Sequence, residues 1–116
     1  MAEPRLDVIA IGRVSVDLYG QQVGGRLEDM ASFAKYVGGC PANISIGGAR
    51  LGLRTALLSR VGDEHMGRYI REQLARESVD TGGLKIDPAR LTALVILGIR
   101  DPDAQPDESP DPAILI

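Results

Sequence analysis

The order of apolar and polar residues divides the first hundred positions into alternating strands and helices. Continuous apolar runs at residues 7–12 and 55–61 are typical of strands that are buried on both faces. A shorter run at residues 84–86 predicts a third strand of this kind. Helices are predicted at residues 41–51 and 64–78, between and beside these strands. The alternation predicts an α/β fold with a parallel sheet.

The longer predicted helix has the clearer periodicity. Its apolar residues recur at every fourth position, at Met66, Ile70 and Leu74. A row of charged residues is expected on the opposite face, at Arg68, Glu72 and Arg76. In the shorter helix we expect Ile44, Gly48 and Leu51 on one face, and the small Gly47 and Gly48 permit close packing on a sheet.

Three other segments show alternation or a high content of β-forming residues. They are residues 14–20, 33–37 and 92–100. Alternation of apolar and polar residues predicts strands with one exposed face. We therefore expect these segments to form lid-like strands that project from the buried sheet.

The composition fits one small globular domain, because 44% of the 116 residues are hydrophobic and 25% are charged. Aromatic residues make up only 3%, so the core is expected to be aliphatic. The single cysteine, Cys40, excludes an internal disulfide and suits a reducing cytoplasm. No apolar stretch approaches the ~20 residues of a membrane span. The net charge of −3 argues against a nucleic-acid-binding protein.

The charge is distributed unevenly along the chain. Residues 101–116 contain five acidic and no basic residues, so the preceding segment has a net charge of +2. Four of the seven prolines also lie in this tail. A segment rich in acids and proline without periodicity is typical of disorder. We therefore expect a domain at residues 1–102 and a divergent, disordered tail at residues 103–116.

The segment at residues 37–45, VGGCPANIS, carries the most information about function. Its glycine pair, Gly38 and Gly39, stands between a predicted strand and a predicted helix, and glycine lets the backbone approach a ligand closely. Pro41 suits the first position of that helix, and Asn43 follows in its first turn. The unpaired amides of a helix start can hold a polar ligand. From these residues alone, a ligand loop and a plain connection between strand and helix are equally compatible with the pattern.

Three further residues are candidates for chemistry. Asp17 is expected to share a strand face with Ser15 and Tyr19, where a carboxylate can accept two sugar hydroxyls or simply face solvent. Cys40 could be activated at a helix start, but we favour a small packing residue there. Arg100 could bind an acidic group through a bidentate contact, or face solvent at a strand end.

Other common sites are not indicated. The sequence has neither the G-x-x-x-x-G-K-[ST] pattern of a P-loop nor the G-x-G-x-x-G pattern of a dinucleotide fold. The one histidine, His65, has no cysteine or histidine at the spacing of zinc ligands. We therefore expect no metal site, and a surface histidine near a helix start.

Seven spaced positions resemble the first signature of the PfkB family of carbohydrate kinases. They are Gly38, Gly39, Pro41, Asn43, Ser45, Gly52 and Gly62. Residues 12–20, 25–30, 33–39 and 60–67 are similar to one branch of that family, whose members phosphorylate 5-dehydro-2-deoxy-D-gluconate in myo-inositol breakdown. The likeness extends from about Asp7 to Asp101 and corresponds to roughly the N-terminal third of such a kinase.

The resemblance implies a ribokinase-like fold, a three-layer α/β/α parallel sheet with a small β lid, of which this chain is the N-terminal part. It also implies that Asp17 holds the sugar hydroxyls. Gly39 and Asn43 match residues that contact the sugar through a backbone amide and a side-chain amide. Together with Gly38 and, more loosely, Arg100, they are the expected substrate-binding residues.

The catalytic part of the family pattern is absent from these residues. The resemblance implies transfer of the γ-phosphoryl group of ATP, with Mg²⁺, by an Asp in a Gly-Ala-Gly-Asp run, and the ATP contacts lie in the same later half. No such run occurs here, so we expect no catalytic residue, no ATP or Mg²⁺ contact and no kinase activity from these residues alone.

The alternatives are a non-catalytic sugar-binding or regulatory remnant, or a kinase for 2-keto-3-deoxygluconate, fructose or a nucleoside. The expected partners are a small sugar or sugar acid, with no nucleic acid and no membrane. A homodimer through the lid strands is a further expectation.

Overall fold

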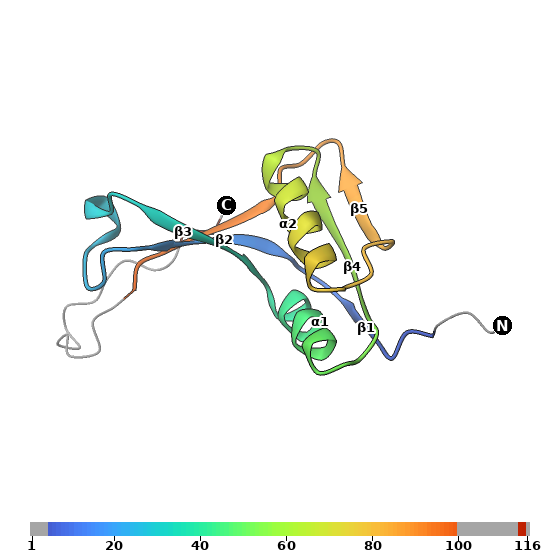
Figure 1. Cartoon of the computed structure of the whole chain (residues 1–116). Coiled ribbons are helices and arrows are strands. Elements are labelled where there is room, and N and C mark those ends of the chain that lie inside the picture. Colours follow the sequence, from blue (N-terminus) through green and yellow to red (C-terminus); the bar gives the residue numbers. More distant parts are fainter. Residues whose placement is uncertain (1–4, 100–113, 116) are drawn as a thin grey trace.

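The continuous apolar runs of the sequence form one parallel sheet, which we call the main sheet (Figure 1). The computed structural model describes residues 5–99 and 114–115. The strands of the main sheet are β1 (Val8–Ile11), β4 (Thr55–Gly62) and β5 (Leu84–Asp87), in the spatial order β1-β4-β5. Both pairings are parallel, as expected for strands joined through helices.

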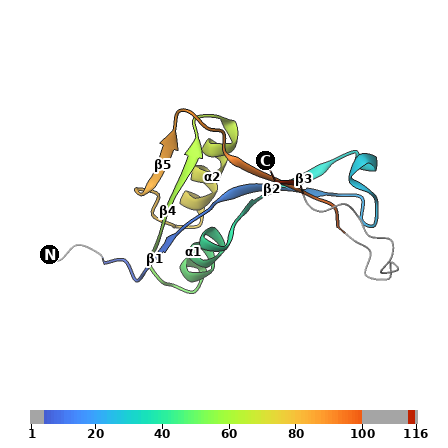
Figure 2. The ribbon, with the colours of Figure 1, turned by 180° about the vertical axis from the view of Figure 1, so that it is seen from behind.

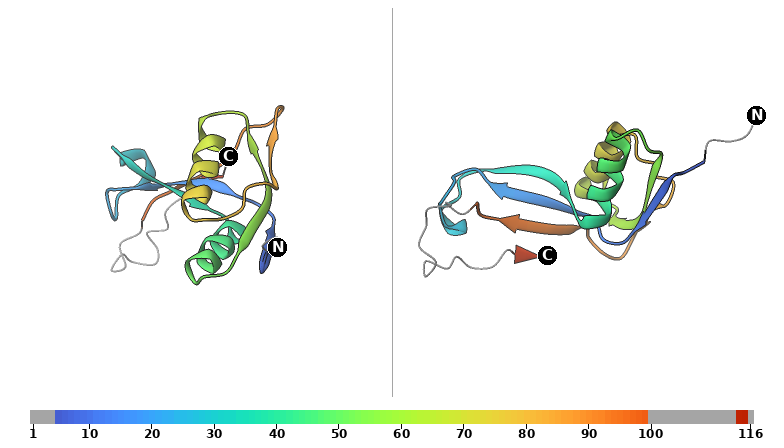
Figure 3. Two further views of the ribbon diagram at one scale, coloured as in Figure 1. Left: turned by 45° about the vertical axis from the view of Figure 1, so that its right-hand side comes forward. Right: turned by 90° about the horizontal axis from the view of Figure 1, so that it is seen from below.

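Two helices, α1 (Cys40–Arg50) and α2 (His65–Arg76), lie on one face of the main sheet (Figures 1 and 3). Ile70 and Leu74 of α2 are fully buried, whereas the charged row on its opposite face is exposed. The core they enter is aliphatic, with Leu57 of β4 at its centre. The spacing of apolar residues therefore predicted the buried face of α2 correctly.

The three alternating segments and two residues of the C-terminal tail form a second, four-stranded sheet, which we call the projecting sheet because it extends away from the helices (Figure 2). Its strands are β2 (Ser15–Gly20), β3 (Phe33–Gly38), β6 (Ala93–Leu97) and β7 (Ile114–Leu115), in the spatial order β3-β2-β6-β7. β2 pairs antiparallel with β3 and parallel with β6. A short 3₁₀ helix, η1 (Leu27–Asp29), lies in the connection between β2 and β3.

α1 packs closely on the main sheet, as its small residues permit, but not through its larger apolar residues Ile44 and Leu51. Ile44 and Leu51 are exposed, by 57% and 84% of their surface, whereas Ala42 and Ser45 are fully buried. The helix packs so closely on the sheet that the Thr55 hydroxyl donates to the Ser45 carbonyl at 2.8 Å. Small residues therefore fill the closest part of the interface, and of the larger apolar residues of α1 it is Ile46 that packs against the core.

The described part of the C-terminal tail also differs from the prediction. Ile114–Leu115 forms strand β7, which pairs antiparallel with Val95 and Ile96 of β6. These two residues belong to an apolar run that follows the acidic and proline-rich positions, and an apolar run can add to an open sheet edge. The rest of the predicted disordered tail, residues 103–113 and 116, lies outside the described residues.

One face of the main sheet is covered and the other is not, within the described residues. Ile9 and Ile11 of β1 and Leu58 of β4 point away from the helices and are exposed by 53%, 74% and 37%. Parallel sheets are normally buried on both faces. Within the described residues, the main sheet therefore has a helical layer on one face and an exposed apolar surface on the other.

Glu64 connects α2 to the base of the projecting sheet. As the N-cap of α2, its carboxylate accepts hydrogen bonds from the Gly67 amide at 2.8 Å and from the Thr92 hydroxyl at 2.6 Å. The Thr92 hydroxyl oxygen in turn accepts from the Gly62 amide at 2.9 Å. Partial burial alone would raise the pKa of Glu64, but these hydrogen bonds together outweigh it and hold the pKa below its ordinary value of 4.5.

We expect Glu64→Gln to lower the free energy of unfolding by about 1 kcal/mol near neutral pH, through the weakened cap. Because the folded-state pKa of Glu64 lies below the unfolded-state value, its contribution is complete above pH 4.5 and is lost as the pH falls through the folded-state pKa. Urea unfolding of the two proteins between neutral and acidic pH should therefore converge at low pH. Glu72→Gln, at an exposed position of α2, is the matched control and should follow the wild type throughout. A difference in the free energy of unfolding between Glu64→Gln and wild type that stayed constant with pH would contradict the lowered pKa of Glu64.

Candidate functional site

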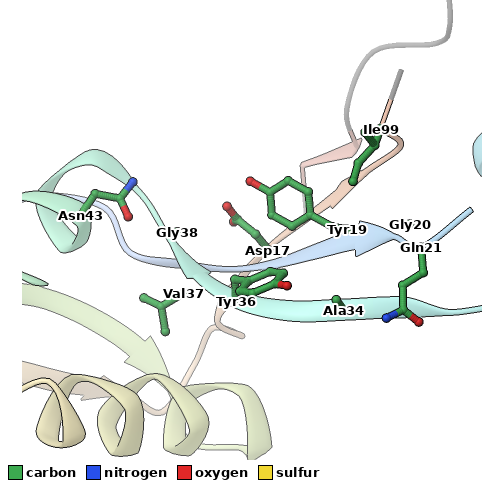
Figure 4. Close-up of a pocket in the computed structure, with 10 residues that line it drawn as sticks. All are labelled: Asp17, Tyr19, Gly20, Gln21, Ala34, Tyr36, Val37, Gly38, Asn43 and Ile99. Carbon is green, nitrogen blue, oxygen red and sulfur yellow. The ribbon is translucent and has the colours of Figure 1, made fainter. Parts of the chain in front are cut away.

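A pocket of about 590 Å³ lies over the paired strands β2 and β3 (Figure 4). Its lining comes from β2, β3 and α1, together with Gln21 after β2 and Ile99 after β6. The residues that matter for its chemistry are Asp17, Tyr19, Gln21, Tyr36, Gly38 and Asn43. The pocket therefore lies where the projecting sheet meets the first helix.

The antiparallel register of β2 and β3 brings the polar residues together. Ser15 pairs with Gly38, and Asp17 pairs with Tyr36. Because alternate residues of a strand share a face, Ser15, Asp17 and Tyr19 follow one another along the same side of β2. Alternation predicted that these residues share one side of β2, and this side is directed toward the pocket.

Asp17 lies directly over the backbone of Gly38. A Cβ atom at Gly38 would overlap all three atoms of the Asp17 carboxylate group. The buried Ser15 hydroxyl donates to Asp17 Oδ1 at 2.8 Å. This hydrogen bond orients the carboxylate, which retains acceptor capacity toward the pocket.

Gly39 lets the chain turn from β3 into α1. Its φ of +98° lies in the region that favours glycine, and a Cβ atom would overlap the carbonyl oxygen of Arg13. Gly39 is the N-cap of α1, and its carbonyl accepts a hydrogen bond from the backbone amide of Asn43 at 3.0 Å. The helix begins at Cys40, so Pro41 occupies the second helical position rather than the predicted first one.

Asn43 brings a side-chain amide to the end of the pocket nearest the helix, opposite the end formed by Gln21 and Ile99 (Figure 4). Its side chain is exposed, and an amide offers both a donor and an acceptor. Among the described residues that line the pocket, Asp17 carries the charge. A hydroxyl-rich, uncharged region of a ligand suits this arrangement, because it can donate to Asp17 and accept from Asn43.

The structure brings three of the predicted site residues to the pocket, namely Asp17, Gly38 and Asn43. Gly39 follows Gly38 but does not line the pocket, and Arg100 lies outside the described residues. Cys40 and His65 are exposed. Within residues 5–99 and 114–115, no group of three or more metal-ligating side chains is found. No helix in the described part of the chain has the length and apolar character needed to span a membrane.

Sequence reasoning missed two aromatic residues of the pocket as site residues. Tyr19 and Tyr36 stand on neighbouring strands with ring centroids 5.4 Å apart and an interplanar angle of 78°. Alternation already placed Tyr19 on the face of Asp17. Tyr36 could be found only with the register of β3 against β2, which one sequence does not reveal.

Comparisons with known proteins show the family of the chain. The family described as pfkB family carbohydrate kinase matches residues 5–104. A 5-dehydro-2-deoxygluconokinase from Geobacillus thermodenitrificans is 42% identical over 98 residues, which are 84% of this chain and 29% of that protein. This chain belongs to the pfkB family of carbohydrate kinases. It spans about 30% of the length of the curated relatives it matches.

Solved structures show the same fold. A sugar kinase from Pyrococcus horikoshii, also solved in complex with ATP, superposes with a TM-score of 0.82 at 34% identity, over 94% of this chain and 35% of that one. A fructokinase from Vibrio cholerae, solved with fructose, ADP and calcium, gives a TM-score of 0.70 at 32% identity, over 94% of this chain and 31% of that one. The ribokinase-like fold class predicted from the sequence is therefore confirmed.

We expect Gly38→Ala to lower the free energy of unfolding by about 0.5–1.5 kcal/mol, because the new methyl group must push the Asp17 carboxylate away from its hydrogen bond with the Ser15 hydroxyl. The matched control is Gly47→Ala in α1, where a Cβ atom meets nothing within 4 Å. That variant should gain roughly 0.5–1 kcal/mol, as expected for glycine replaced by alanine within a helix. Urea unfolding of both variants measures the contrast. Equal stability of Gly38→Ala and wild type would refute the close approach.

Proposed function

We propose that this chain is the sugar-binding part of an ATP-dependent kinase that phosphorylates 5-dehydro-2-deoxy-D-gluconate, a reaction of myo-inositol breakdown in the cytoplasm. The observation that carries the proposal is the pocket in which Asp17, Gly38 and Asn43 meet from three elements. The substrate is suggested by the relatives of this name, which are about 42% identical over the matched segment.

The proposed role of the pocket is to bind and orient the sugar. Asp17, held by the Ser15 hydroxyl, would accept hydrogen bonds from sugar hydroxyls, and the absence of a side chain at Gly38 gives its carboxylate room. Asn43, in the first turn of α1, would contact the sugar through its amide. A charge-assisted hydrogen bond to a carboxylate is among the stronger ones, so Asp17 is expected to dominate.

The identity of the phosphoryl donor is inferred from the family alone. In the family, ATP with Mg²⁺ supplies the phosphoryl group, and catalysis of such transfers rests on positioning and charge stabilisation. The pocket residues Asp17, Gly38 and Asn43 would position the acceptor hydroxyl of the sugar. We propose that the Gly-Ala-Gly-Asp catalytic run and the ATP contacts of the family lie outside these 116 residues, which contain no such run.

The direct test is a chimera in which residues 5–99 replace the matching segment of the Geobacillus thermodenitrificans relative. The chimera should phosphorylate 5-dehydro-2-deoxy-D-gluconate, and Asp17→Ala and Asn43→Ala should each raise KM for the sugar about tenfold to a hundredfold, with KM for ATP unchanged. Arg68→Ala, exposed on α2 away from the pocket, is the control. Unchanged KM for the sugar in both pocket variants would remove them from the site.

A second candidate function is sugar binding without phosphoryl transfer. It is favoured by one observation, namely that the described residues by themselves form a pocket with a carboxylate and an amide.

We expect the purified 116-residue chain to show no sugar-dependent release of ADP in a coupled assay. Sugar binding by the same preparation, measured calorimetrically, would be compatible with both candidates. If the chimera also failed to turn over while it bound sugar, the second candidate would replace the first. ADP release from the chain alone would contradict the assignment of catalysis to other residues.

A further inference from the structure

Two tyrosines form an aromatic wall beside Asp17. Tyr19 on β2 and Tyr36 on β3 meet edge to face, with ring centroids 5.4 Å apart, and both line the pocket (Figure 4). Tyr36 is 55% exposed, although a large aromatic side chain gains free energy from burial. It is directly opposite Asp17 in the strand register, so one pocket face offers a carboxylate next to apolar ring surface.

These two kinds of surface bind different parts of a sugar. A carboxylate accepts hydrogen bonds from hydroxyl groups, whereas a ring face or edge packs against carbon atoms that carry only hydrogen. A hydroxyl placed against a ring loses its hydrogen bonds to water without a replacement, which is unfavourable. The pocket therefore favours a ligand in which hydroxyl-bearing carbons adjoin a carbon without a hydroxyl.

We propose that Tyr19 and Tyr36 are specificity-determining residues that select a deoxy sugar acid by packing against its methylene group. The inference rests on the proposed function and extends it, because 5-dehydro-2-deoxy-D-gluconate has a methylene at C2 where 5-dehydro-D-gluconate has a hydroxyl-bearing carbon. The ring surface, rather than the phenolic hydroxyl, distinguishes the two compounds.

The chain supplies its own spectroscopic probe. It contains three tyrosines and no tryptophan, so its ultraviolet emission comes from tyrosine, and two of the three line the pocket. Titration of the 116-residue chain with each of the two sugar acids gives both dissociation constants. The wild type should bind the 2-deoxy acid about tenfold to a hundredfold more tightly, the usual range for an apolar pocket that rejects an added hydroxyl.

Variants separate the ring from the hydroxyl. Tyr19→Phe and Tyr36→Phe keep the ring and should keep the preference for the deoxy acid, whereas Tyr19→Ser and Tyr36→Ser should bring the two affinities within about threefold. Phe33→Ser is the matched control, because Phe33 is an aromatic residue of β3 that is 40% exposed and does not line the pocket. It should leave the preference unchanged.

The outcomes distinguish the two proposals. Serine variants that retain the preference, or phenylalanine variants that lose it, would overturn the proposal that the tyrosine rings select the deoxy acid. The proposed sugar kinase function would be unaffected. Equal affinity of the wild type for both acids would do the same. Binding of neither acid would overturn the proposed function itself. If circular dichroism shows that the isolated chain is unfolded, the preference is measured instead in the chimera, as the ratio of kcat/KM for the two acids.

Discussion

The close approach of the Asp17 carboxylate to the backbone of Gly38 is the constraint on which the site depends. It requires that β2 and β3 pair in one register, with Ser15 opposite Gly38, and a side chain at Gly38 would force the Asp17 carboxylate to move. A slip of one residue would move Asp17 to the other face of the sheet. The same contact places the end of β3 so that the following glycine can turn the chain into α1 and bring Asn43 to the pocket.

The projecting sheet that carries this site is attached to α2 at two places. At the base of β6, the Thr92 hydroxyl donates to Glu64 at the start of the helix. At β3, the Tyr69 hydroxyl donates to the Lys35 carbonyl at 3.0 Å, while the Lys35 ammonium lies 4.1 Å from the centre of the Tyr69 ring. A cation above an aromatic ring adds a modest attraction. α2 therefore supports the pocket although it contributes no residue to its described lining.

The elements that the sequence predicted well are those with strong periodicity. Ile70 and Leu74 follow the helical repeat and are buried, because α2 has one apolar stripe and one charged face. α1 lacks such a stripe: its small residues Ala42 and Ser45 are buried, and the larger Ile44 is exposed. Side-chain size alone therefore does not mark the buried face of α1, because Ile46 packs against the core whereas Ile44 is exposed.

Part of the candidate site could also be predicted from the sequence. Asp17 and the Gly38–Asn43 segment were recognised from local chemistry and from a family signature. Tyr36 was not, because its position beside Asp17 arises only from the pairing of two strands that are distant in sequence. The pairing of Ile114–Leu115 with β6 was missed for a similar reason, since acidic and proline residues dominate that tail while a short apolar run forms the strand.

The proposed sugar site lies where β2, β3 and the start of α1 meet. Nuclear magnetic resonance of the uniformly ¹⁵N-labelled chain, titrated with 5-dehydro-2-deoxy-D-gluconate, tests it most directly. The largest changes in amide chemical shift are predicted at Asp17, Gly38, Gly39 and Asn43. Shift changes confined to the exposed apolar face of the main sheet, around Ile9, Ile11 and Leu58, would contradict this location of the site.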